Sequence, residues 1–356
     1  MKSTGIPELD IIVRAANKKF GKDFSGERFK SPEPLSTGSL ALDKALRIGG
    51  LPRGRITEIY GVESSGKTSL ALCALANAQK RRKLLGITDK RDLICDVEHS
   101  LTSPFIEGFG IDLDQTIWLR PDKAEEALQI ILDFPKSGAI DFVLFDSVDA
   151  AQNERQLARQ VGEVDMGGIS KDMSFAVRQI SKIAPVKDTT FVFINQIRGN
   201  PSGYGSPKVT PGGNALKFYA TLRIELLKGI PSKDLPDALT MKAIIRKTKI
   251  GTPYHKEVLF DLSYGQGVNP YSDVIAIAKT LGMIRLGGQA CFLKLDPTQE
   301  EIRISSKGGK AGAIIELQQN EELFNQIKEA CFNHDETASN TISSADTDST
   351  EDSDVS

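Results

Sequence analysis

Short apolar runs recur along residues 37–269, and helical stretches separate them. The clearest runs are ITEIYG at 56–61, LICDVE at 93–98, FVLFDS at 142–147 and FVFINQ at 191–196. Apolar runs that alternate with longer helical stretches are typical of parallel strands joined by crossover helices. The pattern therefore predicts an α/β fold with a mostly parallel central sheet.

The chain before this core has a different pattern. Leu9, Ile12, Val13, Ala16 and Phe20 are spaced so that they form one apolar stripe on a short helix. The sequence GKDFSGERFKSPEPLS, which follows, is rich in Gly, Pro, Ser and charge and indicates a linker. We therefore expect the first helix to pack somewhere other than against its own core.

The chain after the core divides into two parts. Amphipathic and strand-like pieces alternate up to about residue 330 and indicate a small α/β domain, whereas the end of the chain contains mostly acidic residues, Ser and Thr. Such a composition favours disorder. We predict four parts: an N-terminal helix and linker at 1–36, a core at 37–269, a small C-terminal domain at 270–332 and a disordered acidic tail at 333–356.

Composition excludes several classes of protein. No apolar run approaches the roughly 18 residues of a membrane span, and the start MKSTGIPELD does not resemble a secretion signal. We therefore expect a cytoplasmic protein. The four Cys residues have no paired spacing and only three His are present, so neither a disulfide framework nor a zinc site is indicated.

The distribution of charge is uneven. The formal net charge is -2, but residues 333–356 hold seven acidic residues and no Lys or Arg. The rest of the chain therefore carries 45 basic and 40 acidic residues. A mildly basic body with an acidic tail is compatible with a polyanionic partner.

The first chemical motif is GVESSGKT, which matches the phosphate-loop pattern G-x-x-x-x-G-K-[ST] and stands between a predicted strand and a predicted helix. In such a loop, glycines allow backbone N–H groups to face phosphates, the Lys reaches the β and γ oxygens, and the Thr hydroxyl holds Mg²⁺. A Gly-rich turn without a ligand is the alternative. The candidate nucleotide-binding residues are Gly61, Val62, Glu63, Ser64, Ser65, Gly66, Lys67, Thr68 and Ser69.

Polar residues end the other three strands. Ligands bind beyond the carboxyl ends of parallel strands, so these residues are expected near the phosphates. Asp146 follows four apolar residues and is the carboxylate expected to support Mg²⁺ together with Thr68. Glu98 is positioned to orient and deprotonate the attacking water, and Gln196 to contact the γ-phosphate. Singly, each is also explained as a solvated strand end.

A long segment after the last of these strands has no apolar periodicity. Residues 198–213 contain five Gly, three Pro, two cations and one aromatic residue, Tyr204. A segment of this composition does not bury enough surface to order itself, and a loop of this length in a compact domain is functional or disordered.

Several separate motifs resemble the RecA family of homologous-recombination proteins. They are LSTGSLALDKAL, GGLPRGRITEIYGVESSGKT, DVEH at 96–99, FDS at 145–147 and INQIR followed by GGNALKFY. The resemblance covers about residues 10–330. It implies an ATP-dependent DNA recombinase: a helical filament on single-stranded DNA, with ATP bound between subunits, that pairs this strand with a homologous duplex. It also implies loading or regulatory proteins as partners.

The resemblance assigns roles to individual residues. Glu98 is the water-activating glutamate and Gln196 the γ-phosphate sensor; Lys67, which the loop motif assigns, is the further catalytic candidate. Phe105 stands where the family often has Tyr and keeps the face that stacks on adenine; alone, it would be read as a core aromatic. Lys247 and Lys249 match lysines that reach a neighbouring subunit's nucleotide, although alone they would be read as solvated strand charges.

The resemblance also assigns DNA contacts. Residues 198–213 correspond to the second of two DNA-facing loops, and GEVDMGG at 162–168 to the first. Cations can meet phosphates there, and an aromatic face can stack on a base. The middle of the second loop, however, has a composition of its own, and Lys171 stands where the family commonly has Arg. The candidates are Lys171, Ser174 and Arg178 on one predicted helix, and Arg198, Tyr204, Lys208, Gly212, Gly213 and Asn214 in and after the loop.

Two other functions share this core. A ring-forming helicase motor would form closed rings and unwind DNA, and an ATP-sensing scaffold would bind ATP without DNA-stimulated turnover. Retention of Glu98 together with both sets of loop cations argues against the scaffold. The interpretation we adopt is a recombinase that uses ATP and Mg²⁺ and acts on single-stranded and double-stranded DNA.

Overall fold

The computed structural model describes residues 6–20, 31–151, 168–199, 208–295 and 300–334. The chain forms two compact units, residues 1–33 and 34–356. The first contains helix α1 (Pro7–Phe20), at the place where the apolar stripe predicts a helix. Its first turn carries Glu8 and Asp10 and its last turn Lys18 and Lys19, which complements the helix dipole. Ile11 and Ile12 are exposed within this unit.

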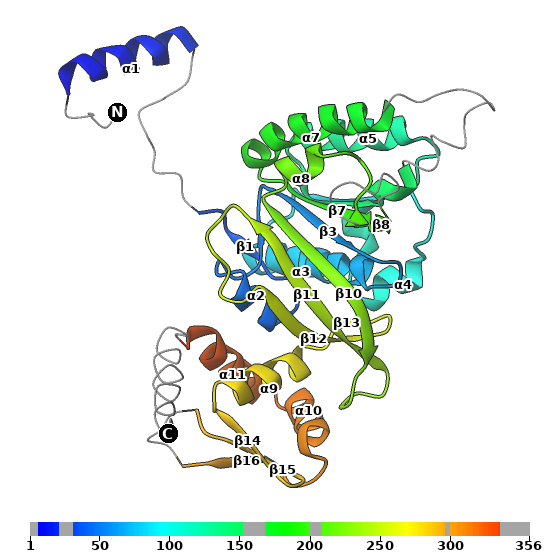
Figure 1. Cartoon of the computed structure of the whole chain (residues 1–356). Coiled ribbons are helices and arrows are strands. Elements are labelled where there is room, and N and C mark those ends of the chain that lie inside the picture. Colours follow the sequence, from blue (N-terminus) through cyan, green and yellow to red (C-terminus); the bar gives the residue numbers. More distant parts are fainter. Residues whose placement is uncertain (1–5, 21–30, 152–167, 200–207, 296–299, 335–356) are drawn as a thin grey trace, which may run out of the picture. The chain divides into compact units, whose positions relative to one another are not determined.

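A large mixed sheet forms the centre of the second unit (Figure 1). Six of its strands run parallel, in the order β10-β3-β7-β6-β4-β5, which confirms the predicted α/β fold. Their bounds are β3 Ile56–Gly61, β4 Arg91–Asp96, β5 Thr116–Leu119, β6 Ile140–Asp146, β7 Thr190–Gln196 and β10 Leu222–Pro231.

The remaining strands of this sheet are antiparallel, which the repeated strand-helix pattern did not predict. Strand β11 (Ala238–Thr248) pairs with β10, β12 (Glu257–Ser263) with β11, and β13 (Gly267–Val268) with β12. The segment between β10 and β11 is too short for a crossover helix, so the chain turns back as a hairpin.

Helices cover both faces of the sheet, and the strands supply alternate residues to each face. Phe142 and Leu144 of β6 join the core cluster that contains α3 (Lys67–Leu85). Val143 and Phe145 join the opposite cluster, which contains α5 (Ala124–Asp133) and α7 (Gly168–Lys187). Both faces of the sheet are therefore buried, as expected for parallel strands whose sequences are continuous apolar runs.

Short elements complete this part of the chain. Small two-stranded sheets pair β1 with β2 and β8 with β9. The bounds are β1 Pro34–Leu35, α2 Leu40–Ala45, β2 Leu51–Pro52, α4 Ser103–Gly108, β8 Arg198–Gly199, β9 Lys208–Val209 and α8 Ala215–Tyr219, with 3₁₀ turns at Leu113–Gln115 and Phe134–Ser137.

The small C-terminal region has its own apolar cluster and an antiparallel sheet, β14-β15-β16. It contacts the core through α2, where Asp273 accepts hydrogen bonds from the Ser39 hydroxyl (2.9 Å) and the Ala41 backbone (3.1 Å). Its elements are α9 Pro270–Thr280, β14 Ile284–Gly287, β15 Ala290–Leu293, β16 Ile302–Ser305, α10 Gly309–Gln319 and α11 Glu321–Asn333.

Two sequence expectations concern membrane-spanning segments and the cysteine residues. In the described ranges no helix combines the length and the apolar character that a bilayer crossing requires. All four Cys residues are buried free thiols. The acidic tail from residue 335 onward lies outside the described residues.

A buried ion-pair cluster fixes α3 to the sheet at the edge opposite the phosphate loop. The Arg82 guanidinium donates two hydrogen bonds of 2.7 Å to Asp92 and one of 3.0 Å to Asp141. All three side chains are almost completely buried. Buried charges in such a cluster stabilise the fold only as long as each keeps its partner.

We expect Arg82→Ala to destabilise the protein by about 3–5 kcal/mol, because it leaves the buried Asp92 carboxylate without its cation. Urea denaturation without DNA and nucleotide measures this free energy of unfolding. The exposed neighbour Lys83 gives the control, and Lys83→Ala should stay within about 0.5 kcal/mol. Equal unfolding midpoints for the two variants would contradict the assigned role.

Candidate functional site

The phosphate loop connects the end of β3 with the start of α3, as the motif predicts. Gly66 stands before the helix with φ 75°, and Ser64 has φ 56°. A Cβ atom on Gly61 would lie 2.2 Å from the Leu226 carbonyl oxygen, and one on Gly66 would lie 2.9 Å from Leu262. The fold therefore requires both glycines independently of any phosphate.

Lys67 and Thr68, the two polar residues that end the motif, are each fixed by a hydrogen bond. Lys67 is almost completely buried and its ammonium donates to the Val62 carbonyl at 2.7 Å. Burial lowers the pKa of Lys67, and the nearby Asp146 and Glu98 carboxylates oppose this shift. The Thr68 hydroxyl donates to Asp146 at 2.8 Å. The motif and the end of β6 thus form one connected site.

Asp146 has the most strongly shifted pKa of this site. It is 1% exposed, and burial, followed by the charge of Glu98, raises its pKa to about 7, while the bond from Thr68 opposes the shift. A carboxylate in this position stays ionised at neutral pH when a cation lies beside it. The arrangement suits a metal ion held between Thr68 and Asp146.

Glu98 lies next to Asp146, because the chain beyond β4 continues to follow β6. The backbone N–H groups of Val97 and Glu98 donate to the Asp146 carbonyl at 2.7 and 3.2 Å. The Glu98 side chain is exposed and accepts a 2.5 Å hydrogen bond from the Ser147 hydroxyl. Ser147 is therefore a further site residue; the sequence indicated it only as a polar strand end.

Gln196 ends β7 directly beside the phosphate loop. Its Cα partner in β3 is Gly61, and the backbone of Ile197 donates to the Gly61 carbonyl at 3.1 Å. The preceding residue, Asn195, is buried and donates to Glu58 at 3.0 Å and to the Pro211 carbonyl at 3.1 Å. The same strand end therefore touches the phosphate loop and the last residues of the 198–213 segment.

Lys247 and Lys249 lie away from the phosphate loop. Lys247 pairs in register with Arg223, which pairs with Glu58, three residues before the end of β3. The Lys249 backbone donates to Thr221, still closer to the amino end of the sheet. Both ammonium groups bind the Phe218 carbonyl, at 3.0 and 2.7 Å, and thus satisfy the C-terminus of α8.

Phe105 is half-buried on α4. It packs against the core cluster and meets Phe109 edge-on, with ring centroids 5.2 Å apart. Tyr264, which the sequence pattern did not indicate, is 90% exposed. A Cβ on Gly108 would lie 2.5 Å from the Gly265 carbonyl, so the turn after β12 touches the end of α4. Tyr264 is therefore adjacent in sequence to a residue that contacts this helix.

Helix α7 carries the predicted DNA-facing residues between its start and its middle. Lys171 and Arg178 are exposed, and Ser174 is half-buried with its hydroxyl bonded to the Ser170 carbonyl at 2.5 Å. Phe175 is 51% exposed, and the Arg178 guanidinium lies 5.9 Å from its ring centroid. An exposed aromatic residue beside cations is a further candidate, and its place among them was the available sequence signal.

The second predicted DNA loop is described at both ends. Arg198 makes two contacts with the buried Asp149, at 2.6 and 2.8 Å, so its charge is already engaged. Lys208 lies in β9, which pairs with β8. Tyr204 and most of the first loop, residues 162–167, lie outside the described residues.

The end of this loop rests on α7. Gly212 and Gly213 have φ 81° and 74°. A Cβ on Gly212 would lie 2.6 Å from Val148, and one on Gly213 would lie 3.2 Å from Ser170. Asn214 then begins α8 without a side-chain cap. The two glycines bring the loop close to the helix that carries Lys171 and Arg178.

Comparison with known proteins gives a consistent result. The family model described as the RecA N-terminal domain matches residues 8–269. Three curated proteins named Protein RecA are similar to the chain. That of Ruminococcus albus is 39% identical over 287 residues, which is 79% of this chain and 70% of the relative. The proteins of Desulforapulum autotrophicum and Streptomyces ambofaciens are 38% and 36% identical, over 91% and 90% of this chain and 92% and 84% of the relatives.

The family match covers the phosphate loop, Glu98, Asp146 and Gln196, which the fold brings together at one sheet edge. The three relatives extend the similarity over most of the chain. The chain therefore belongs to the RecA family of homologous-recombination proteins.

Proposed function

We propose that this chain, an ATP-dependent DNA recombinase and DNA-dependent ATPase, hydrolyses ATP with Glu98 as the general base and with Mg²⁺ held by Thr68 and Asp146. One observation carries the proposal. A continuous series of contacts runs from the Thr68 hydroxyl to Asp146, through its neighbour Ser147, and on to the Glu98 carboxylate. The phosphate loop and the base thus form one assembly.

The residues fit ATP and Mg²⁺. Backbone N–H groups at the start of α3 favour phosphate oxygens, and the partial positive charge of the helix N-terminus adds to this attraction. Lys67 would reach the β and γ oxygens. Mg²⁺ prefers oxygen ligands and would find the Thr68 hydroxyl and the Asp146 carboxylate together. When bound, it would neutralise charge on the phosphates.

Glu98 would orient the attacking water and accept its proton. The Ser147 hydroxyl donates a hydrogen bond to Oε1 of Glu98. This hydrogen bond fixes the carboxylate while the side chain stays exposed to water. Gln196 is paired in register with Gly61, and its side-chain amide can donate a hydrogen bond to the γ-phosphate. Base and sensor would then lie at the ends of β4 and β7, which are on the same side of β3 in the strand order.

The place of Lys247 and Lys249 supports ATP sites shared between subunits. Both residues lie toward the amino end of the sheet, whereas the phosphate loop is at the carboxyl end. Lysines in this position would reach the nucleotide of an adjacent subunit. Hydrolysis would then depend on assembly into a helical filament on single-stranded DNA in the cytoplasm.

Adenine would bind beside α4. Phe105 is partly buried and packs against the core cluster, and the exposed part of its ring would stack on the base. Tyr264 is exposed on a turn that touches the same helix and would offer a second aromatic face.

DNA would bind along the start of α7 and the adjacent end of the second loop. Lys171 and Arg178 would contact phosphates, and Phe175 would stack on a base. The approach of Gly213 to Ser170 places the loop end beside these side chains.

Arg178→Ala is expected to make the salt dependence of single-stranded DNA binding shallower, by about 0.7 in the slope of log affinity against log salt for each phosphate that the variant leaves without a cation. Fluorescence titration with labelled DNA and a slowly hydrolysed ATP analogue measures the slope. Lys279→Ala, which removes an exposed cation from the end of α9, is the control and should keep the wild-type slope. An unchanged slope for Arg178→Ala would mean that this residue is only a surface charge.

Electron microscopy of the protein with single-stranded DNA and the ATP analogue tests the assembly. Open helical filaments are the expected result. Closed rings, together with unwinding of duplex DNA, would indicate a ring-forming motor and contradict the filament assembly.

A further inference from the structure

The turn that carries Glu98, residues 97–101, is closed by the carboxylate of the residue that precedes it, Asp96. Strand β4 ends at Asp96, and His99 has φ 53°, in the left-handed region that non-glycine residues seldom adopt. The chain then folds back, and the backbone N–H groups of Ser100 and Leu101 donate to Asp96 at 3.2 and 3.3 Å. Glu98 therefore lies inside a turn whose two ends are joined by Asp96.

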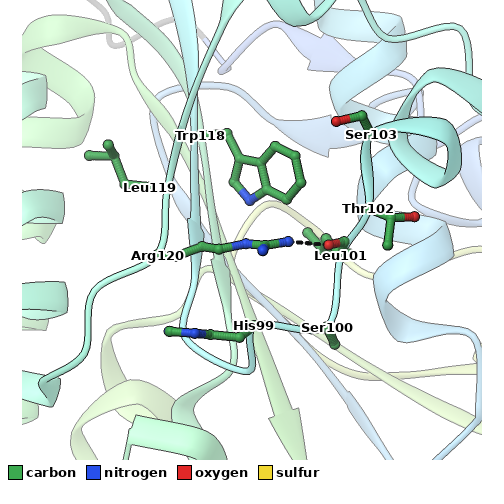
Figure 2. Close-up of a pocket in the computed structure, with 8 residues that line it drawn as sticks. All are labelled: His99, Ser100, Leu101, Thr102, Ser103, Trp118, Leu119 and Arg120. Atoms are coloured by element: carbon green, nitrogen blue, oxygen red, sulfur yellow. Dashed lines mark hydrogen bonds between the residues drawn. The ribbon is translucent and has the colours of Figure 1, made fainter.

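Asp96 has 0% exposure and needs a cationic partner. Arg120, just after β5, supplies it: its Nε lies 3.2 Å from Asp96 Oδ2. The same guanidinium donates through Nη2 to the Leu101 carbonyl. Figure 2 shows Arg120 reaching across the pocket toward Leu101, with His99 and Ser100 on the turn beside it. Arg120 thus binds both Asp96, which precedes the turn, and Leu101, which ends it.

Two further contacts fix Arg120 and the turn. The guanidinium lies over the Trp118 ring, 4.5 Å from its centroid, and the His99 ring bonds the Pro121 carbonyl at 3.2 Å. His99, Trp118 and Arg120 line a pocket of about 650 Å³ that is open to solvent, and the Arg120 side chain is 42% exposed. The stacked, two-point arrangement depends on the planar guanidinium, which a lysine lacks.

We infer that Arg120 is a positioning residue for ATP hydrolysis, which fixes the 97–101 turn through Asp96 and Leu101 so that Glu98 faces the reacting water. The inference rests on the proposed role of Glu98. Without Arg120, the buried Asp96 loses its ion pair and the end of the turn loses its anchor. Glu98 would then keep its bonds to Ser147 and to the Asp146 carbonyl, but Arg120 would no longer anchor the end of its turn at Leu101.

The test compares Arg120→Ala and Arg120→Lys with Lys123→Ala, which removes a nearby cation that is 72% exposed and forms a solvent-exposed ion pair with Glu126. Arg120→Ala should lower the kcat of DNA-stimulated hydrolysis by about 10- to 100-fold, because a displacement of about 1 Å has effects of this size. Affinities for the ATP analogue and for DNA in its presence should change less than about threefold, within ordinary variation between variants. Arg120→Lys should recover part of kcat, and Lys123→Ala should match the wild type.

A double-mutant cycle with Glu98→Gln separates positioning from general stability. If Arg120 acts through Glu98, Arg120→Ala should change the residual single-turnover rate of Glu98→Gln by less than about twofold. An equal loss of rate in both backgrounds, or a loss of nucleotide affinity parallel to kcat, would overturn the inference.

The same experiment distinguishes the role of Glu98 from that of Arg120. Near-normal turnover of Glu98→Gln would remove Glu98 from the mechanism and the inference with it. A large loss in Glu98→Gln together with wild-type kcat in Arg120→Ala would overturn only the positioning role of Arg120.

Discussion

Replacing Glu98 with Gln is expected to lower the rate of DNA-stimulated ATP hydrolysis by about 100-fold or more, while ATP and DNA still bind. A positioned general base contributes a factor of at least about this size, and Gln keeps the shape and the bond from Ser147 but cannot accept the proton. Steady-state hydrolysis with saturating single-stranded DNA measures the rate, and fluorescence titration with the ATP analogue measures binding.

Glu107→Gln is the matched control, because Glu107 is an exposed carboxylate on the nearby α4. This variant should hydrolyse ATP at the wild-type rate. If Glu98→Gln did so as well, another group would have to activate the water. If it lost nucleotide affinity instead, Glu98 would contribute to binding rather than to the chemical step.

Gln196→Ala is expected to leave ATP affinity nearly intact but to remove most of the gain in DNA affinity that ATP produces. Gln196 lies beside Gly61 at the phosphate loop, and its neighbour Asn195 bonds to Pro211 near the end of the DNA loop. A bond to the γ-phosphate would bias the loop toward its DNA-binding conformation. Couplings of this kind are typically about 1–3 kcal/mol, or about 5- to 150-fold in affinity.

Titration of labelled single-stranded DNA with the ATP analogue or with ADP gives the ratio of affinities for each variant. By linkage, most of the DNA stimulation of hydrolysis should also disappear in Gln196→Ala. Tyr204→Ala provides the contrast, because loss of a stacking face should weaken DNA binding with either nucleotide. A Gln196→Ala protein that keeps the wild-type ratio would contradict the coupling.

The residues of the phosphate site could be predicted from the sequence alone. The loop motif placed Lys67 and Thr68, and the apolar runs placed Glu98, Asp146 and Gln196 at strand ends. The fold brings these residues to one edge because the carboxyl ends of parallel strands coincide there. A periodic pattern and a fixed direction of the strands were sufficient for this prediction.

The contacts between side chains could not be predicted from the sequence and follow from the tertiary structure. The contacts of Ser147 with Glu98, of Arg198 with Asp149 and of Arg120 with Asp96 join residues that are 24 to 49 positions apart. No local periodicity encodes such pairs, because they depend on strand order and on the rotamers of both partners. Strand order also placed Lys247 and Lys249 toward the opposite end of the sheet from the phosphate loop, since three antiparallel pairings extend the sheet where the sequence pattern indicated further crossovers.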